Sequence, residues 1–238
     1  MFHYVRFKNF FSFRCETELS FRLNRHVPED RRSFTSPTGQ RLTKLLAVIG
    51  PNASGKTNAL KPLAFLKWFV TDSFFAKPDA SLAFQTHFFS DDPASEFLLE
   101  FEINGKVYRY ELVATREKVI FEAVYVKTSR LFSYLFRREW QAENNEYQVQ
   151  QKQFGFNPYE ARQVRPNASL ICTAAQFKVP LALDIVRFFR SLYTNVDFMG
   201  RRHFSYGDVF KAADFFADHE YAVGQMTELL RKWDLGLA

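Results

Sequence analysis

The first fifty residues alternate between hydrophobic and polar side chains in a way that predicts short β-strands. Residues 2–13 and 16–23 each carry the two-residue period of a half-buried strand. Residues 24–41 are polar and are interrupted by proline and glycine, which predicts a loop with its tip at 36–39. Residues 44–49 form a short hydrophobic run typical of a buried strand.

Helical periodicity begins shortly after this run. Residues 57–72 fit one helix, and the proline that they contain falls early enough to be tolerated. The side chains expected on its buried face are Leu60, Leu63, Ala64, Lys67 and Trp68. Residues 73–95 have no clear period, which predicts an irregular connection.

The middle of the chain returns to a period of two and predicts an antiparallel sheet. Asn104 and Gly105 separate two alternating segments and predict a two-residue hairpin turn, and Asn144 and Asn145 mark a later turn. The expected strands are 97–103, 107–113, 119–127, 131–138 and 147–153.

Beyond Pro166 the pattern becomes helical. The proline at position 180 falls in a first helical turn, where its missing N–H costs no hydrogen bond. The expected helices are 169–177, 180–192, 206–217 and 220–233. Strands followed by helices predict a mixed α/β chain.

A phosphate-binding motif lies between the hydrophobic run and the first helix. Gly50-Pro51-Asn52-Ala53-Ser54-Gly55-Lys56-Thr57 is a full match to G-x-x-x-x-G-K-[ST]. Gly50 and Gly55 permit backbone turns in which a Cβ would clash. The amides from Ala53 to Thr57 are expected to point inward at a helix N-terminus, where anions bind. The motif predicts a site for the triphosphate of ATP or GTP.

Two side chains of the motif are expected to carry the chemistry. Lys56 is predicted to reach the β- and γ-phosphates as the catalytic residue, and the Thr57 hydroxyl to hold Mg²⁺. ATP and Mg²⁺ are therefore the expected cofactors. The residues expected to bind the nucleotide are Gly50, Asn52, Ala53, Ser54, Gly55, Lys56 and Thr57.

The acidic half of an ATPase site is missing from the pattern. Hydrolysis needs a hydrophobic strand that ends in Asp or Asp-Glu, which binds the metal and activates water. Asp184 lies in a helical pattern and Asp197 follows polar residues, so neither fits. Glu100 and Glu102 are expected to face solvent from the hairpin.

Composition excludes several other classes of protein. Hydrophobic residues make up 47% and charged residues 24% of the chain, which excludes wholesale disorder. Cys15 and Cys172 lie too far apart for a zinc ribbon or a disulfide framework, which suits a reducing cytoplasm. No hydrophobic run approaches the roughly 18 residues of a membrane span, so no membrane partner is expected.

Positive charge is concentrated in the first third of the chain. Residues 1–75 hold 12 Lys and Arg against 5 Asp and Glu, within a net charge of +6 for the whole chain. A basic surface there could face nucleic acid, although solvated faces and triphosphate binding also account for it. Arg31-Arg32 and Arg201-Arg202-His203 could contact phosphate or lie in solvated loops.

Phenylalanine is unusually common, with 29 copies. Phe10, Phe11 and Phe13 could stack on an adenine ring, but core packing is the first expectation for three closely spaced aromatic residues.

Two segments resemble the opening of a known group of ATPases. Phe7–Phe13 and Ala47–Thr57 are similar to the start of ABC-type ATPases of the SMC and RecF-like group. Within it they are most similar to the AAA family ATPases of bacterial anti-phage systems, which include OLD-type, Septu-type and retron-associated proteins. Residues 97–127 also resemble the β-lobe of these proteins, and 229–236 resembles the segment before their signature region.

The resemblance implies a P-loop NTPase fold, an ABC/SMC-like head that is incomplete here. Residues 1–95 would be the first part of the nucleotide-binding core and 96–165 an antiparallel β-lobe. Residues 166–238 would be a helical extension leading to a missing C-terminal half. That half would hold the signature motif, the Asp-Glu strand and a switch histidine.

The same resemblance implies partners and two further roles. Two heads of such ATPases sandwich ATP, so a homodimer or higher oligomer is expected, and residues 1–238 alone would bind ATP poorly and hydrolyse little. Asn52 and Ser54 would line the phosphates. Gln85 is the candidate for the Q-loop glutamine at the metal, although a lone loop glutamine is otherwise simply solvated.

Three functions stay open. The resemblance implies an ATPase of anti-phage defence that hydrolyses ATP as a dimer and controls an associated effector, a nuclease or a toxin. The alternatives are an ATP-dependent assembly scaffold with little turnover and a DNA-clamping repair ATPase of RecF or SMC type. The basic first third favours the DNA-clamping alternative.

Overall fold

The computed structural model describes residues 1–28, 30–202 and 205–232. The chain divides into two compact units, Met1–Gly200 and Arg201–Ala238. The part boundaries expected after residues 95 and 165 both fall inside the first unit. None of the helices in the described ranges has the length and hydrophobicity that crossing a bilayer requires.

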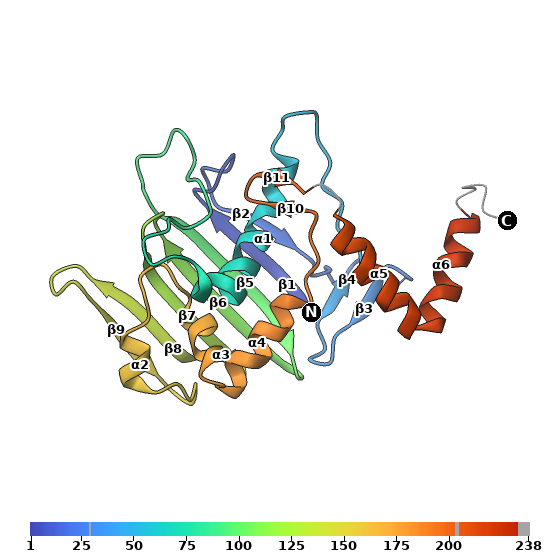
Figure 1. Ribbon diagram of the computed structural model, residues 1–238. Helices are drawn as coiled ribbons and strands as arrows, with labels where there is room; N and C mark the ends of the chain where they lie inside the picture. Colours follow the sequence, from blue (N-terminus) through green and yellow to red (C-terminus); the bar gives the residue numbers. More distant parts are fainter. Residues whose placement is uncertain (29, 203–204, 233–238) are drawn as a thin grey trace. The chain divides into compact units, whose positions relative to one another are not determined.

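A seven-stranded antiparallel sheet forms the centre of the first unit (Figure 1). Its order is β2-β1-β5-β6-β7-β8-β9, so two strands from the start of the chain lie beside five consecutive strands from its middle. The strands are β1 Phe2–Lys8, β2 Thr17–Ser20, β5 Ser95–Ile103, β6 Lys106–Ala114, β7 Val119–Lys127, β8 Phe132–Gln141 and β9 Glu146–Gln151. The first segment and the middle of the chain therefore share one sheet.

Most strand predictions are confirmed, with changes at their ends. Asn104 and Gly105 have φ values of 50° and 69°, as a hairpin turn with two left-handed residues requires. The first strand ends at Lys8, short of residue 13, because Asn9 takes a φ of 52° and begins a turn. The polar loop holds a small hairpin, β3 (Ser33–Thr35) and β4 (Arg41–Thr43), around its expected tip.

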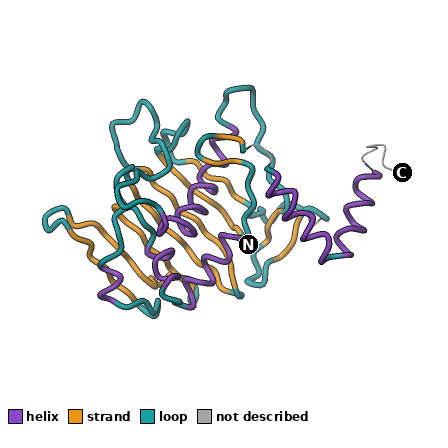
Figure 2. Tube along the Cα trace, viewed as in Figure 1, coloured by secondary structure: helices purple, strands orange, loops and turns teal. Residues whose placement is uncertain are grey.

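Helices α1, α3 and α4 cover one face of the sheet (Figures 1 and 2). The positions of all expected helices are confirmed, while the short α2 was not expected. Its start has a readable signal, because Asn157 caps the amides of Tyr159 and Glu160. The remaining elements are α1 Lys56–Asp72, η1 Ser73–Phe75, α2 Pro158–Arg162, α3 Leu170–Gln176, α4 Pro180–Arg190, β10 Val196–Asp197, β11 Gly200–Arg201, α5 Tyr206–Asp218 and α6 Glu220–Lys232. Trp233 lies outside the described residues.

The buried face of α1 differs from the expected one. Leu60 is 39% exposed, whereas Phe65, Leu66, Phe69 and Val70 are almost fully buried. Hydrophobic residues occur on several sides of this helix, so its period does not define which side packs. The contact with the sheet decides the orientation.

An aromatic cluster joins α1 to the sheet. Phe10 and Phe65 lie with their ring centroids 5.2 and 5.1 Å from that of Phe97 on β5. Phe84 packs against the same rings, and Phe10 is 1% exposed. Phe11 and Phe13 are partly buried against this cluster. The expectation that these aromatic residues belong to the core is confirmed.

A buried ion pair lies between the sheet and α3. Glu122 on β7 and Arg138 on β8 are both 0% exposed, and Arg138 Nη1 lies 3.5 Å from Glu122 Oε2. The Glu122 carboxylate accepts hydrogen bonds from the Tyr110 hydroxyl and from Ser169 Oγ and Leu170 N at the start of α3. Burial lowers the pKa of Arg138 and raises that of Tyr110.

Arg138 also holds the segment that leads into α3. Its guanidinium donates hydrogen bonds to the carbonyl oxygens of Val164, Arg165 and Ala168 at 2.7–2.8 Å. It stacks 3.7 Å above the ring centroid of Tyr147, whose pKa burial raises to about 12. The pair therefore fixes the chain between β9 and α3 on the sheet.

A second buried polar cluster contradicts the expectation that Glu100 and Glu102 face solvent. Both are 2% exposed. His3 on β1 lies between them, with Nδ1 3.3 Å from Glu100 Oε1 and Nε2 3.3 Å from Glu102 Oε2. Arg22 pairs with Glu100, and Thr38 donates to Glu102 at 2.6 Å. These partners come from distant parts of the chain, which strand alternation cannot reveal.

This cluster predicts a stability that depends on pH. Burial and the charge of Arg22 lower the pKa of His3, against the opposing effect of Glu102. In the unfolded chain, His3 takes up a proton near the ordinary histidine pKa of about 6.5, whereas in the folded chain it takes up a proton only at lower pH. Lowering the pH from about 7.5 to 5.5 should therefore reduce the free energy of unfolding, by about 1 kcal/mol or less.

Urea denaturation at the two pH values measures this difference. His3→Gln should have a smaller pH dependence than the wild-type chain, and His26→Gln, at an exposed histidine, should keep the wild-type dependence. An equal pH dependence in the two variants would contradict the assignment to His3.

Candidate functional site

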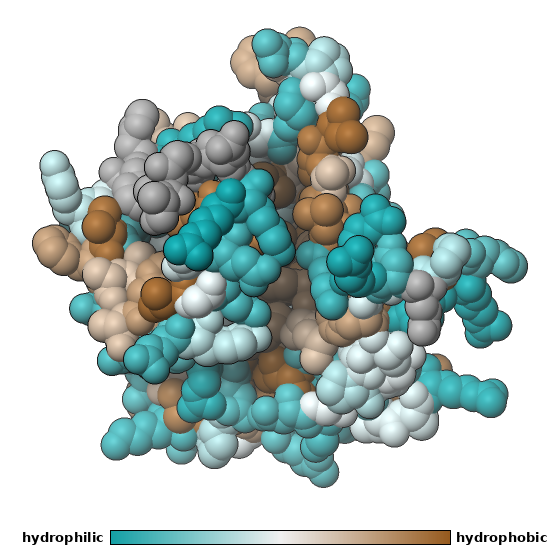
Figure 3. All heavy atoms as spheres, turned by 90° about the vertical axis from the view of Figure 1, so that its right-hand side faces the viewer, coloured by the Kyte–Doolittle hydropathy of each residue, from teal (hydrophilic) through white to brown (hydrophobic). Residues whose placement is uncertain are grey.

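Residues 44–49, the expected buried strand, are irregular and exposed. Ile49 is 91% exposed and Leu45 66%. A strand needs a neighbour for its backbone N–H and C=O groups, and no strand of the described residues pairs with this segment. The prediction of a buried strand is wrong for this structure. Large hydrophobic side chains of other segments are also exposed. Figure 3 shows hydrophobic residues (brown) at the surface among hydrophilic ones (teal) on one face of the molecule.

The Gly50–Thr57 loop leads directly into α1. Gly55 occupies the N-cap of the helix with a φ of 86°, and Ala53 has a φ of 64°. No side chain caps the first turn of α1, and that turn contains no acidic residue. The amides of Gly55, Lys56 and Thr57 have no hydrogen-bond acceptor in the described part of the chain. The loop thus ends in unpaired donors at the positive end of a 17-residue helix.

The Lys56 side chain folds over this loop. Its Nζ donates hydrogen bonds to the carbonyl oxygens of Gly50 at 2.8 Å and Pro51 at 2.5 Å. Ser54 closes the loop from inside, since its Oγ lies 2.7 Å from where a Cβ on residue 50 would be. The ammonium is therefore held at the first two residues of the loop, and a Cβ at position 50 would displace the Ser54 hydroxyl.

A turn after β1 packs against the end of this loop. Ser12 Oγ accepts a hydrogen bond of 2.6 Å from Asn58 Nδ2 on α1. A Cβ on Gly55 would lie 3.2 Å from Ser12 Cβ. Lys61, buried one turn further along α1, places its Nζ 3.8 Å from the ring centroid of Phe11, and burial lowers its pKa. The N-terminal turn and the loop form one packed structure.

Two glycines allow a controlled test of this packing. Gly55 and Gly39 have similar left-handed φ values of 86° and 82°, but a Cβ would meet Ser12 only at Gly55. Each change to alanine should cost about 1–2 kcal/mol of unfolding free energy for the left-handed backbone. Gly55→Ala should cost more, and only it should weaken nucleotide binding. Equal losses of stability by chemical denaturation would contradict the described contact.

The other expected site residues lie on this loop or beside it, and they differ in exposure. Asn52 and Ser54 are exposed on the loop, and Thr57 is half-buried in the first turn of α1. Gln85 is exposed on the 76–94 connection, and its carbonyl oxygen accepts a hydrogen bond of 2.9 Å from Phe11 N. Gln85 therefore adjoins the turn that contacts Gly55. Its role at a metal stays a prediction.

The acidic candidates rejected from the sequence have structural partners. Asp184 lies on α4 and accepts hydrogen bonds from Asn104 and Arg187. Asp197 on β10 accepts hydrogen bonds from the amides of Met199 and Gly200. Within the described ranges, no group of three or more His, Cys, Asp or Glu residues could hold a metal ion. These ranges therefore supply no acidic metal cluster.

The two basic clusters have different surroundings. Arg32 Nε donates to the Asp30 carboxylate at 2.8 Å, and both side chains are solvent-accessible. Arg201 and Arg202 are exposed, and His203 lies outside the described residues. Contact of either cluster with phosphate stays a prediction.

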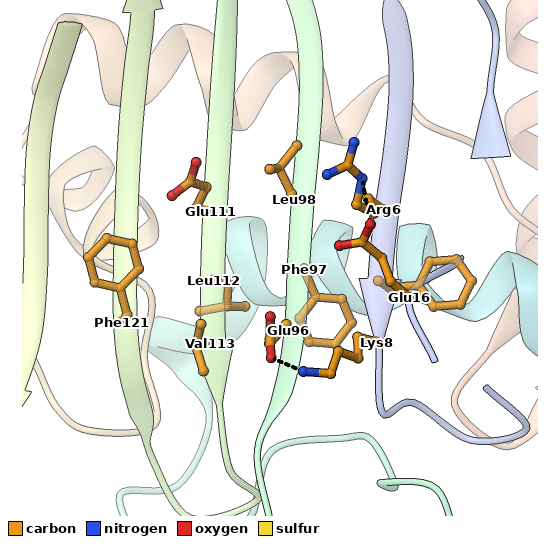
Figure 4. A pocket seen from close by; sticks show the side chains of 11 residues that line it. Arg6, Lys8, Glu16, Glu96, Phe97, Leu98, Glu111, Leu112, Val113 and Phe121 are labelled. Atoms are coloured by element: carbon orange, nitrogen blue, oxygen red, sulfur yellow. Dashed lines mark hydrogen bonds and ion pairs between the residues drawn. The ribbon is translucent and has the colours of Figure 1, made fainter. Parts of the chain in front are cut away.

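A shallow hollow of about 230 Å³ lies elsewhere, on the sheet face opposite α1 (Figure 4). Its charged side chains largely neutralise one another: Lys8 Nζ lies 2.7 Å from Glu96 Oε1, and Arg6 pairs with Glu16. Hydrophobic side chains such as Leu98 and Phe121 complete the lining. The hollow has no free donors for phosphate comparable to those of the Gly50–Thr57 loop.

Comparison with known protein families gives a match over most of the chain. A family model described as "AAA domain, putative AbiEii toxin, Type IV TA system" matches residues 45–235. The match covers most of the chain and includes the Gly50–Thr57 loop. No curated protein matches the chain significantly.

Proposed function

The chain belongs to this AAA domain family, and we propose that it grips the triphosphate of ATP with Mg²⁺ in the Gly50–Thr57 loop. Membership implies a nucleotide-binding ATPase domain, in which the nucleotide usually carries Mg²⁺. The mixed α/β fold with its large antiparallel sheet is consistent with such a domain. The assignment of the nucleotide to this loop is our proposal.

The single observation that carries the proposal is the uncapped start of α1. Unpaired amides at Gly55, Lys56 and Thr57 need an acceptor, and the helix dipole favours an anion there. The Lys56 ammonium lies on the same loop and adds positive charge. Phosphate oxygens satisfy all of these donors together, which no hydrophobic or cationic ligand does.

Each motif residue has a distinct role in this proposal. Lys56 leaves the Gly50 and Pro51 carbonyls and neutralises the β- and γ-phosphates as negative charge develops on them. The Thr57 hydroxyl would hold Mg²⁺, and Gln85 would orient the metal or water from the neighbouring turn. When bound, Mg²⁺ would supply positive charge that neutralises the triphosphate.

Under this proposal, ATP is hydrolysed by an oligomer. No ion pair or hydrogen bond joins an acidic side chain to the Gly50–Thr57 loop in the described part of the chain. An ATPase needs such a group to activate water. In the ATPase group that the sequence resembles, an Asp-Glu strand of the same subunit supplies this group, and a second subunit closes on the bound nucleotide with its signature motif.

Steady-state phosphate release tests this function. The rate per subunit should rise with protein concentration and require Mg²⁺, and Thr57→Ala should lower it at least tenfold. Thr43→Ala, a threonine outside the loop, should leave the rate unchanged. Mg²⁺-independent release, or an equal rate in Thr57→Ala, would contradict the proposal.

The biological role proposed is defence against phage, with the ATPase controlling an associated effector. The sequence resemblance supports it, and the family description names a toxin of a type IV toxin–antitoxin system. Expression with the genes encoded beside it, followed by phage challenge, tests this role. Protection should require Lys56, and protection that survives Lys56→Ala would contradict it.

A DNA-clamping ATPase is the second candidate, favoured by the charge of residues 1–75. A DNA-binding titration at several salt concentrations decides between the two. Neutralising several phosphates gives affinity a steep dependence on salt. Weak binding with little salt dependence would remove this candidate.

A further inference from the structure

One asparagine side chain closes the loop that carries Gln85. Asn9 is 2% exposed, and its Nδ2 donates hydrogen bonds to the carbonyl oxygens of Asp92 at 2.7 Å and Ala94 at 2.8 Å. Its Oδ1 accepts a hydrogen bond of 3.0 Å from His87 N. Both amide hydrogens and the carbonyl oxygen of this side chain are therefore used to hold the two ends of residues 85–94 together.

The same turn of the chain contacts the nucleotide loop. Phe11 N donates to the Gln85 carbonyl at 2.9 Å, which places the first residue of the 85–94 loop against the turn. The next residue, Ser12, packs against Gly55 and accepts the hydrogen bond from Asn58. Residues 9–12 thus touch the 85–94 loop on one side and the start of α1 on the other.

The backbone at Asn9 is built for this position. Its φ of 52° lies in the left-handed region, which asparagine tolerates better than most residues. Its carbonyl oxygen accepts a hydrogen bond from Ser95 Oγ at the start of β5. The residue therefore ends β1, turns the chain toward Gly55 and fastens the loop in one place.

We propose that Asn9 is a positioning residue that holds the 85–94 loop in register with the Gly50–Thr57 loop, so that a bound nucleotide orders Gln85. The inference rests on the proposed function. Asn9 touches neither the loop amides nor Lys56, so it acts through the turn and not on the nucleotide. Its loss should reduce turnover far more than nucleotide affinity.

Asn9→Gly is the direct test because glycine keeps the left-handed backbone and removes only the side chain. Asn145→Gly is the matched control, since Asn145 has the same φ of 52° in an exposed turn between β8 and β9. Three quantities are measured in each variant: the Kd for Mg²⁺ with a non-hydrolysable ATP analogue, kcat, and amide hydrogen exchange of residues 85–94 with and without the analogue.

In Asn9→Gly, kcat should fall at least tenfold while Kd changes less than threefold. The analogue should slow exchange of the 85–94 amides in the wild-type chain and in Asn145→Gly, but not in Asn9→Gly. Asn9→Asp, which presents oxygens to the carbonyls of Asp92 and Ala94, should behave like Asn9→Gly. The melting temperature without nucleotide separates loss of folding from loss of positioning.

An unchanged kcat in Asn9→Gly, or analogue-dependent protection that persists there, would overturn the inference. The inference would also be overturned if ATP-analogue affinity, kcat and melting temperature all fell together in both Asn9 variants. That result would show that Asn9 stabilises the fold and does not position the loop. Failure of the wild-type chain and of Asn145→Gly to bind the analogue would instead refute the proposed function. The two failures are therefore distinguishable.

Discussion

Lys56→Ala should weaken the binding of Mg²⁺–ATP at least a hundredfold. The ammonium is expected to make two charge-assisted hydrogen bonds to phosphate, worth about 1.5 kcal/mol or more each, and about 2.7 kcal/mol corresponds to a hundredfold change in Kd. The side chain is half-buried and, among the described residues, bonds to the Gly50 and Pro51 carbonyls, so the folded chain should lose little stability. Binding is measured by displacement of a fluorescent ATP analogue.

Lys44→Ala is the matched control for this change. Lys44 is an exposed lysine six residues before Gly50, so its removal changes the net charge equally without touching the loop. Its variant should bind within twofold of the wild-type chain. Equal loss of affinity in both variants would mean that general positive charge attracts ATP, and the assignment to the loop would fail.

Removing one member of the buried pair Glu122–Arg138 should have the largest effect on stability. Glu122→Gln leaves the Arg138 guanidinium buried without a counter-charge. Arg138→Met leaves the Glu122 carboxylate buried without a counter-charge. Each should lower the free energy of unfolding by about 3–5 kcal/mol. The double variant should lose less than the sum of the two, because it leaves no unpaired buried charge. Chemical denaturation measures all three.

Arg137 provides the comparison for the arginine change. It is the neighbouring residue on β8 but is exposed, so Arg137→Met should cost less than about 1 kcal/mol. Additive losses in the double variant, or a loss at position 137 as large as that at 138, would show that the buried pair does not stabilise the junction of β7, β8 and α3.

Local pattern was sufficient to predict the antiparallel part of the fold. Strands β5 to β9 alternate in hydrophobicity, and Asn104-Gly105 has the residues that a left-handed two-residue turn requires. The pairing of β1 with β5, nearly ninety residues apart, was not predictable in this way. Alternation shows which residues share a face but does not choose a neighbouring strand.

The predictions that failed depended on contacts between distant residues. Glu100 and Glu102 sit in alternating strands and resemble surface charges, yet His3, Arg22 and Thr38 enclose them. Residues 44–49 have the hydrophobicity of a buried strand but lack a partner strand in the described ranges. A hydrophobic pattern indicates that a segment prefers burial, but it does not show which other segment of the chain would bury it.

The candidate site was predictable to the extent that it is local. The motif predicts the loop and the start of α1, and Gly55 takes a left-handed φ of 86° at the helix N-cap, a conformation that suits glycine. The turn at Ser12 and the closure of the 85–94 loop by Asn9 were not predicted, because these contacts join residues 46 to 85 positions apart. The available signal in the sequence was the asparagine that follows the first strand, because asparagine tolerates a left-handed backbone better than most residues.

Calorimetric titration of the wild-type chain with ATP, with and without Mg²⁺, tests the central claim most directly. The account predicts saturable binding at one site per chain that strengthens with Mg²⁺ and is lost when adenosine replaces ATP. Binding of adenosine as tight as that of ATP, or no binding of ATP at any concentration tested, would contradict a triphosphate site at the start of α1.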